Sequence, residues 1–154
     1  MSKLLSARFL SALLATSSLV GPALAAAPGA EQAAAMESRA RAQIAAFPGY
    51  TLHGADHAYA RRDAIVDNDG AQHVRFERSY RGMAVIGGDL VVHADRNGNF
   101  REASHSLRRG INVARGAALS QGRAIQAALG AHAGSTNGIA PTLVVYARGD
   151  TPVP

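Results

Sequence analysis

Histidine and aspartate are the side chains of this sequence whose spacing could support chemistry. His53 and His57 are four residues apart, so on a helix they would share one face and could hold a metal ion. The His-Glu-x-x-His class of zinc enzymes needs a glutamate directly after the first histidine, whereas Gly54 follows it here. We therefore expect His53 and His57 to be surface histidines before a strand, and we predict no metal site.

A second candidate is the segment Asp67-Asn68-Asp69-Gly70, which begins like a calcium-binding loop. Such a loop ends on a glutamate at its twelfth position, and that position, 78, is an arginine. A turn between two strands is the simpler interpretation. The sequence also lacks a Gly-x-Ser-x-Gly nucleophile elbow and a phosphate-binding Gly-Lys-Ser/Thr loop. We predict no catalytic residue in this chain.

Composition removes further classes of function. The 154 residues include no cysteine, which excludes thiol catalysis, disulfides and cysteine-based zinc sites. Arginines alternate with acidic residues and are not interspersed with aromatic side chains, so we do not expect nucleic-acid binding. The mixed charge is typical of a solvated surface.

The N-terminus has the pattern of an export signal. Lys3 and Arg8 precede an apolar run from Phe9 to Val20, which is too short for a membrane core that needs roughly 20 residues. A retained membrane anchor is the alternative. Removing residues 1–25 takes two positive charges away, so the net charge falls from +5 to +3. We expect an exported, extracellular or periplasmic protein, with no membrane contact beyond export. The small residues that signal peptidase would read are Ala23, Ala25 and Ala26.

The mature chain begins with a predicted helix over residues 31–46. Met36, Ala40, Ile44 and Phe47 are spaced by four, four and three residues, which places them on one helical face. We expect this face to be buried, and Pro48-Gly49 to end the helix.

Three antiparallel strands are predicted next, over residues 73–80, 85–94 and 100–107. In the first strand Val74, Phe76 and Tyr80 alternate with polar residues. Gly87-Gly88 interrupts the second strand, as a bulge would. Asn97-Gly98 favours a tight turn with positive φ at both residues, and Arg81-Gly82 is a further turn. We expect Arg75, Arg78 and Arg81 to lie on a solvated strand face; the alternative is that they face an acidic partner.

In the last part of the chain, the sequence predicts a connector over residues 108–118, followed by a helix and then a strand. Ser120 can cap a helix over residues 121–129, with Ile125, Ala128 and Leu129 facing inward and Gly130 ending it. Residues 143–146 read as a strand, followed by a turn at residues 149–150. The chain then ends at Pro154, which would leave this strand without its next partner. We therefore expect the chain to be the front part of a longer product.

The segment over residues 73–93 resembles the central motif of the fungalysin/thermolysin propeptide domain. Its residues are HVRFERSYRGMAVIGGDLVVH, and the family motif is approximately H-V-R-(Y/F)-x-Q-x-Y-x-G-(L/V)-P-V-(F/W)-G-(G/A)-x-(L/V)-x-V-(H/N). Arg78 stands where glutamine is usual, and Ala84 where proline is usual. The positions that carry the resemblance, as structural or partner-surface residues, are His73, Arg75, Phe76, Tyr80, Gly82, Val85, Gly87, Gly88, His93 and Gly98.

The segment from Leu119 to Tyr146 is similar to the start of a PepSY-type domain, but lacks the family's next strand. The two resemblances imply an α+β fold, an antiparallel meander with packed helices followed by a partial cystatin-like unit. The expected domains are a signal peptide at 1–25, a propeptide domain at 26–110 and a partial, truncated PepSY-like domain at 111–154.

The resemblance also implies a function. Such pro-regions assist the folding of a thermolysin-like zinc metalloendopeptidase in the same precursor, and they inhibit it until they are removed. It implies that the chain itself is not an enzyme and carries no cofactor. Zinc belongs to the absent protease domain, with calcium left open. The expected partner is that cognate protease, in cis. Two alternatives are a free-standing secreted protease-binding or inhibitor module and a truncated fragment without function.

Overall fold

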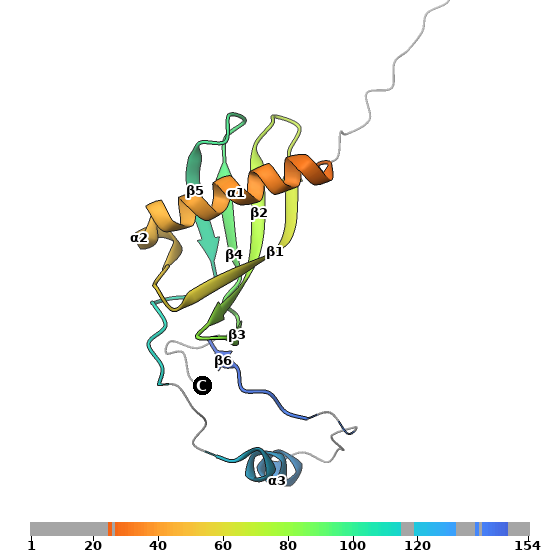
Figure 1. Ribbon diagram of the computed structural model, residues 1–154, viewed down its shortest axis with the longest axis vertical. Coiled ribbons are helices and arrows are strands. Elements are labelled where there is room, and N and C mark those ends of the chain that lie inside the picture. The colour runs from red at the N-terminus through yellow and green to blue at the C-terminus, as the bar shows by residue number, and fades with distance from the viewer. Residues whose placement is uncertain (1–24, 26, 115–118, 132–137, 139, 148–154) are drawn as a thin grey trace, which may run out of the picture.

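The computed structural model describes residues 25, 27–114, 119–131, 138 and 140–147, and this part of the chain is a mixed α+β structure (Figure 1). None of its helices is long and apolar enough to cross a bilayer. Its elements are the helices α1 (Ala30–Ala46), α2 (Pro48–Thr51) and α3 (Gln121–Ala131) and the strands β1 (His57–Val66), β2 (Gln72–Tyr80), β3 (Met83–Ile86), β4 (Leu90–Ala94), β5 (Phe100–His105) and β6 (Val145–Tyr146).

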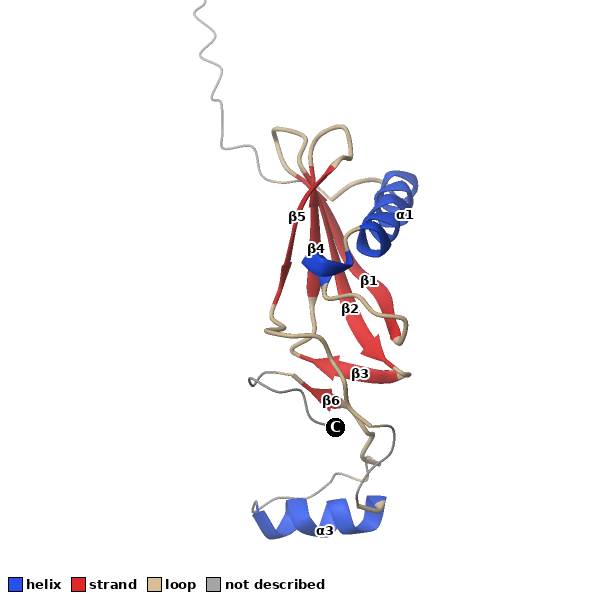
Figure 2. Cartoon of the chain, turned by 90° about the vertical axis from the view of Figure 1, so that its left-hand side faces the viewer, coloured by secondary structure: helices blue, strands red, loops and turns tan. Residues whose placement is uncertain are grey.

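The sheet is organised around β2, and its curvature is visible in Figure 2. β1 pairs antiparallel along one edge of β2, while β4 and β3 pair antiparallel with successive parts of the other edge. β5 continues the sheet beyond β4, and β6 runs parallel to β3. The predicted antiparallel strands are therefore confirmed. β1 is an additional strand, which alternation did not indicate because Ala64 is its one buried residue.

Helix α1 covers one face of the sheet (Figure 2). Met36, Ala40 and Ile44 are buried, as the helical spacing predicts, and they join the core cluster that contains Phe76 of β2. Phe47 departs from the prediction. It lies beyond the end of α1 with 38% of its surface exposed, and its ring stacks on Phe100 of β5 with centroids 4.3 Å apart.

The turn from β4 to β5 differs from its predicted type. Gly98 has φ +83, but Asn97 does not have a positive φ. The Gly98 amide donates to the Asp95 carbonyl and the Asp95 amide to that of Asn99, both at 2.9 Å. The Asp95 carboxylate accepts bonds from the Asn97 and Asn99 amides, which favours this wider turn over the two-residue form.

The two-residue turn with positive φ at both positions is found between β2 and β3 instead. Arg81 has φ +50 and Gly82 has φ +80, and the flanking residues Tyr80 and Met83 pair directly. This geometry matches the right-handed twist of the two strands. The predicted turn at 67–70 is also confirmed, and it joins β1 to β2.

The predicted interruption at Gly87-Gly88 separates β3 from β4. Both strands pair with the same edge of β2, but β3 leaves this edge after Ala84 and β4 returns to it at Leu90, so the chain must loop out between them. Gly87 has φ +82, and a Cβ on Gly88 would lie 2.5 Å from Cγ1 of Val85. The two glycines therefore meet two different demands, a left-handed backbone and a close approach.

A second core cluster lies at the β3 end of the sheet. Connector residues Ile111 and Val113 are buried there although their segment shows no periodicity, and Val145 of β6 is fully buried beside Val85. Pairing with β3 thus ties the predicted strand at 143–146 to this sheet, although only its last two residues form β6.

Helix α3 is confirmed in position, but its predicted inward face is wrong. No residue of α3 is buried, and Leu129 is 39% exposed. Figures 1 and 2 show the helix away from the sheet, where no described element packs over it. Gly130 does not end the helix, which continues to Ala131.

Gly88→Ala should lower the free energy of unfolding by about 1–3 kcal/mol, because its Cβ must displace the buried Val85 side chain. The control is Gly110→Ala, where nothing lies within 4 Å of the added Cβ, and its effect should stay within about 0.5 kcal/mol. Urea unfolding followed by circular dichroism measures both. Equal losses in the two variants would contradict the close packing at Gly88.

Candidate functional site

The face of the sheet opposite α1 is the candidate functional surface. Because side chains alternate along a strand, Arg75 and Glu77 of β2 point away from the core that contains Phe76. In the described part of the chain no helix covers this side of the sheet (Figure 2). We call this the open face.

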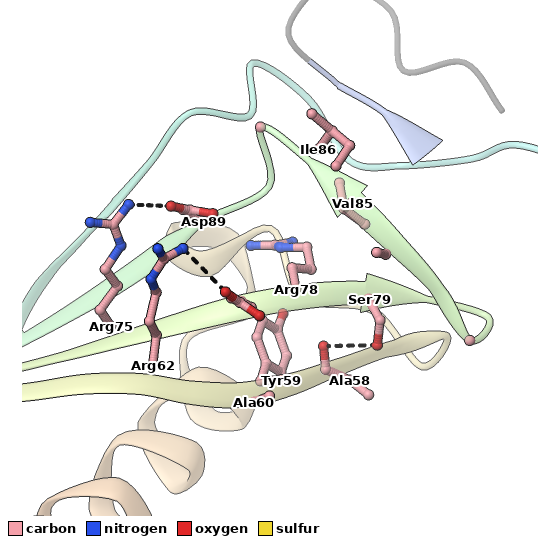
Figure 3. Close-up of a pocket in the computed structure, with 14 residues that line it drawn as sticks. Ala58, Tyr59, Ala60, Arg62, Arg75, Arg78, Ser79, Val85, Ile86 and Asp89 are labelled. Carbon is pink, nitrogen blue, oxygen red and sulfur yellow. Dashed lines mark hydrogen bonds and ion pairs between the residues drawn. The ribbon is translucent and has the colours of Figure 1, made fainter. Parts of the chain in front are cut away.

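A hollow of about 740 Å³ lies on the open face where β3 diverges from β1 and β2 (Figure 3). Much of its lining is short side chains, while Ile86 adds an apolar side chain that is 40% exposed. These small residues leave room for another molecule's side chains to approach the strands. The short side chains that line it are Ala58, Ala60, Ser79 and Ala84.

Two ion pairs border this hollow. Arg62 contacts Glu77 at 3.1 Å, and Arg75 contacts Asp89 (Figure 3). All four side chains are well exposed, so these pairs add little to stability. They give the rim alternating positive and negative charge.

Arg78 contradicts the expectation of a solvated arginine. Its surface is only 2% exposed, and it lies on the α1 side of β2, opposite Arg75. Its guanidinium donates to the carbonyl oxygens of Thr51 and Leu52 at 2.7 Å each and of Gly88 at 3.2 Å. No described carboxylate pairs with it; backbone carbonyls hold the buried charge instead.

The guanidinium also sets the state of two neighbouring rings. It lies 5.3 Å from the centroid of the Tyr59 ring, and Nη1 donates to Nδ1 of His57 at 3.2 Å. His57 must therefore be neutral, with its proton on Nε2. Burial and the adjacent Arg78 charge lower the pKa of His57 to about 4. Burial raises the pKa of Tyr59, against the opposing effect of Arg78.

The structure also places His53 and His57 relative to each other. Their ring centroids are 6.2 Å apart, and Nδ1 of His53 lies 3.3 Å from the hydroxyl of Tyr59. Both histidines are half-buried, so the expectation that they lie on the surface is wrong. Among the residues the structure describes, no group of three or more His, Asp or Glu side chains could hold a metal ion.

The ten motif residues fall into three places and do not form one site. Three of them, Phe76, Tyr80 and Val85, are buried in the core. The glycines belong to the turns: Gly82, Gly87 and Gly98 have positive φ, and Gly88 allows close packing. The open face takes His73, Arg75 and His93, and His93 is half-buried. Their role at a partner surface stays a prediction.

Arg81 does not join Arg75 in a shared basic surface. It lies at the β2–β3 turn, where its side chain donates to the Asp56 carboxylate at 2.8 Å and to the Val113 carbonyl at 3.2 Å. Arg75 therefore lies on the open face, Arg78 in the core and Arg81 at the β2–β3 turn. Of the predicted signal-cleavage residues, Ala23 and Ala26 lie outside the described residues and Ala25 is exposed.

Residues 58–107, from the start of β1 to just beyond β5, match the family described as Fungalysin/Thermolysin Propeptide Motif. This segment is a fungalysin/thermolysin propeptide motif. The propeptide motif therefore consists of the five-stranded part of the sheet, with the open face and Arg78. The chain is also 37% identical, over 107 residues, to the transglutaminase-activating metalloprotease of Streptomyces mobaraensis. That alignment covers 65% of this chain and 14% of the length of the relative.

Replacing Arg78 should test its role in holding the propeptide motif together. Arg78→Met should cost about 2–4 kcal/mol of unfolding free energy, because three carbonyl groups lose their donor. Arg78→Gln, which keeps an amide donor, should cost less. Arg75→Met on the exposed side of the same strand should cost under about 1 kcal/mol. Chemical denaturation of the three variants gives the comparison, and a neutral Arg78→Met would refute the network.

His57 should make stability depend on pH. Its pKa is about 4 in the folded chain and 6.5 when unfolded, so the unfolded state binds more protons between these values. Stability should therefore fall as the pH drops from 6.5 towards 4, by about 1–2 kcal/mol after allowing for the partial exposure of the ring. Urea unfolding at several pH values should show this component in the wild type and not in His57→Gln. A difference between the two that does not change with pH would contradict the assignment.

Proposed function

We propose that this chain is the pro-region of an exported thermolysin-like zinc metalloendopeptidase, and that it assists the folding of that peptidase and inhibits it before removal. The propeptide motif at residues 58–107 and the similarity to a metalloprotease support this role. The peptidase domain would lie outside this chain, in the same precursor. Zinc, and any calcium, would belong to that domain.

The observation that carries the proposal is the open face of the propeptide motif. α1 packs on one face of the sheet, whereas the other face, with its hollow of about 740 Å³, is exposed to solvent. A folding template needs a surface that is ordered before its client is ordered. Strands held on one side by a helix and free on the other meet this requirement.

The chemistry of the open face suits a protein partner. Ile86 and the short side chains of the hollow offer apolar area, and the Arg62–Glu77 and Arg75–Asp89 pairs offer both signs of charge around it. An interface with an apolar centre and a charged rim can gain binding energy at the centre. Its charges would set the register and select the cognate peptidase.

The two activities can share one surface. A template that binds the folding transition state of a slowly folding peptidase lowers its barrier. The same contacts, kept after folding, would hold the pro-region over the cleft. Cleavage and loss of the pro-region would then make activation irreversible, and the mature enzyme would persist through kinetic stability.

The C-terminal part extends this proposal. We assign residues 111–154 to the beginning of a second, PepSY-like unit, to which α3 and β6 belong. The uncovered apolar side chains of α3, such as Leu129, would pack against chain that continues this unit. Export would use the leader at residues 1–25, cleaved near Ala25.

Inhibition in trans tests the proposal. The full chain should inhibit the peptidase domain of the Streptomyces relative in a dose-dependent manner, and it should leave an unrelated serine protease unaffected. Ala60→Arg, which fills the hollow, should weaken inhibition at least about tenfold, equivalent to roughly 1.4 kcal/mol of binding energy. Peptide hydrolysis at increasing chain concentrations measures all three.

The matched control is Ala35→Arg, which adds the same side chain on the exposed side of α1. It should inhibit as well as the wild type. Inhibition that is absent up to roughly 100 µM, a concentration that would reveal even weak binding, would reject the inhibitor role. Equal losses in both variants would reject the open face as the binding surface.

A further inference from the structure

His73 and His93 face each other across the open face of the sheet. They are direct partners in the register of β2 and β4, and their Nδ1 atoms are 2.7 Å apart. Nε2 of His73 lies 2.9 Å from a carboxylate oxygen of Asp67, and Nε2 of His93 lies 2.9 Å from the hydroxyl of Ser104. The pair therefore has each outer nitrogen held by an oxygen and the two inner nitrogens aimed at one another.

The carboxylate fixes how protons are distributed along this row. An ionised Asp67 can only accept, so Nε2 of His73 carries a proton and its Nδ1 is left as an acceptor. His93 must then donate from Nδ1. One proton therefore lies between two nitrogen atoms that could each bind a metal ion. No other short nitrogen–nitrogen contact of this kind is found between histidines among the described residues.

We propose that His73 and His93 bind one divalent transition-metal ion of the zinc or nickel type through their Nδ1 atoms, bridging β2 and β4. The ion replaces the shared proton, and His93 takes up a proton on Nε2 in exchange for the one lost from Nδ1, so both rings stay neutral and no net proton is released. Neutral imidazole is a preferred ligand of these ions and a poor one for calcium or magnesium. The proposal departs from the expectation of a chain without metal, and it does not depend on the proposed function.

The distances require little movement. Two nitrogens at 2.0–2.1 Å from a tetrahedral ion are separated by about 3.3 Å. The present separation is 2.7 Å, so the rings would need to part by about 0.6 Å. The Asp67 and Ser104 contacts can persist, because a metal-binding histidine typically donates its other ring proton to a carboxylate or another oxygen.

The surroundings leave room for the remaining ligands. The two rings line a hollow of about 380 Å³ together with Glu102 and Arg101. Glu102 lies directly opposite His93 in the register of β4 and β5, and its carboxylate and that of Asp67 place negative charge near the His93 ring. No third protein ligand is already in place among the described residues, so water would complete the coordination. We expect micromolar affinity.

Calorimetry with the full chain, purified without an affinity tag, tests the site. Zn²⁺ and Ni²⁺ should each bind with a stoichiometry of one, and Ca²⁺ should not bind. His93→Asn should weaken Zn²⁺ binding at least tenfold. Asp67→Asn should weaken it about 10–100-fold through loss of the outer hydrogen bond. His53→Asn is the matched control, because it removes a histidine outside the pair, and it should bind as the wild type does.

Nuclear magnetic resonance of the ring nitrogens keeps the test independent of whether a variant folds. In the wild type, Zn²⁺ should shift the Nδ1 signals of two histidines, those of His73 and His93, while Nε2 of His73 stays protonated and Nε2 of His93 becomes protonated. Zinc should also raise the midpoint of thermal unfolding by several degrees at a hundredfold excess over the dissociation constant. Unchanged Nδ1 signals, equal binding by His93→Asn, or loss of binding in His53→Asn would overturn the proposal.

Discussion

The buried guanidinium of Arg78 is the constraint on which the arrangement of this chain depends. A charge this deeply buried is costly unless its donors are used, and here three backbone carbonyls use them. Thr51 and Leu52 lie at the end of α2, and Gly88 lies in the step from β3 to β4. One side chain on the central strand therefore fixes where the helical segment ends and where the second edge of β2 changes partner. The hydroxyl of Thr51 extends this connection to the carbonyl of Ile44 at 3.2 Å, near the end of α1.

The two faces of the sheet follow from this arrangement. β2 alternates strictly, so a position that serves the core cannot also serve the open face, and a register shift of one residue would exchange Arg78 with a neighbour such as Glu77. The buried network makes such a shift unfavourable, because neither Glu77 nor Ser79, the residues next to Arg78, carries a guanidinium. The open face can therefore carry charge, short side chains and a histidine pair without losing register.

Much of this fold could be predicted from the sequence where one physical signal acted alone. Helical spacing identified the buried face of α1, and alternation with glycine-containing turns identified β2 and β5. The failures occurred where a second interaction decided the outcome. Asn97-Gly98 favours a two-residue turn, but the Asp95 carboxylate stabilises a wider one. In the sequence Arg78 cannot be distinguished from the exposed arginines near it. The backbone carbonyls that accept its hydrogen bonds lie 26, 27 and 10 residues away, so no local pattern indicates them. The His73–His93 contact likewise depends on the pairing of two strands, and only the register of the sheet reveals it.

The absence of cysteine makes such polar contacts more important than they would be in a cross-linked domain. A chain without disulfides must hold its sheet by packing, and here alanine contributes several of the buried positions and little area at each. Directional hydrogen bonds then favour one of several loosely packed arrangements. In each alternative arrangement a buried carbonyl would lose its donor, which costs free energy. Arg78 acts in this way between α2, β2 and the β3–β4 step, and the His73–His93 pair acts between β2 and β4 on the other face. Both contacts converge on β2, so the surface proposed to act as a template is ordered from within the central strand.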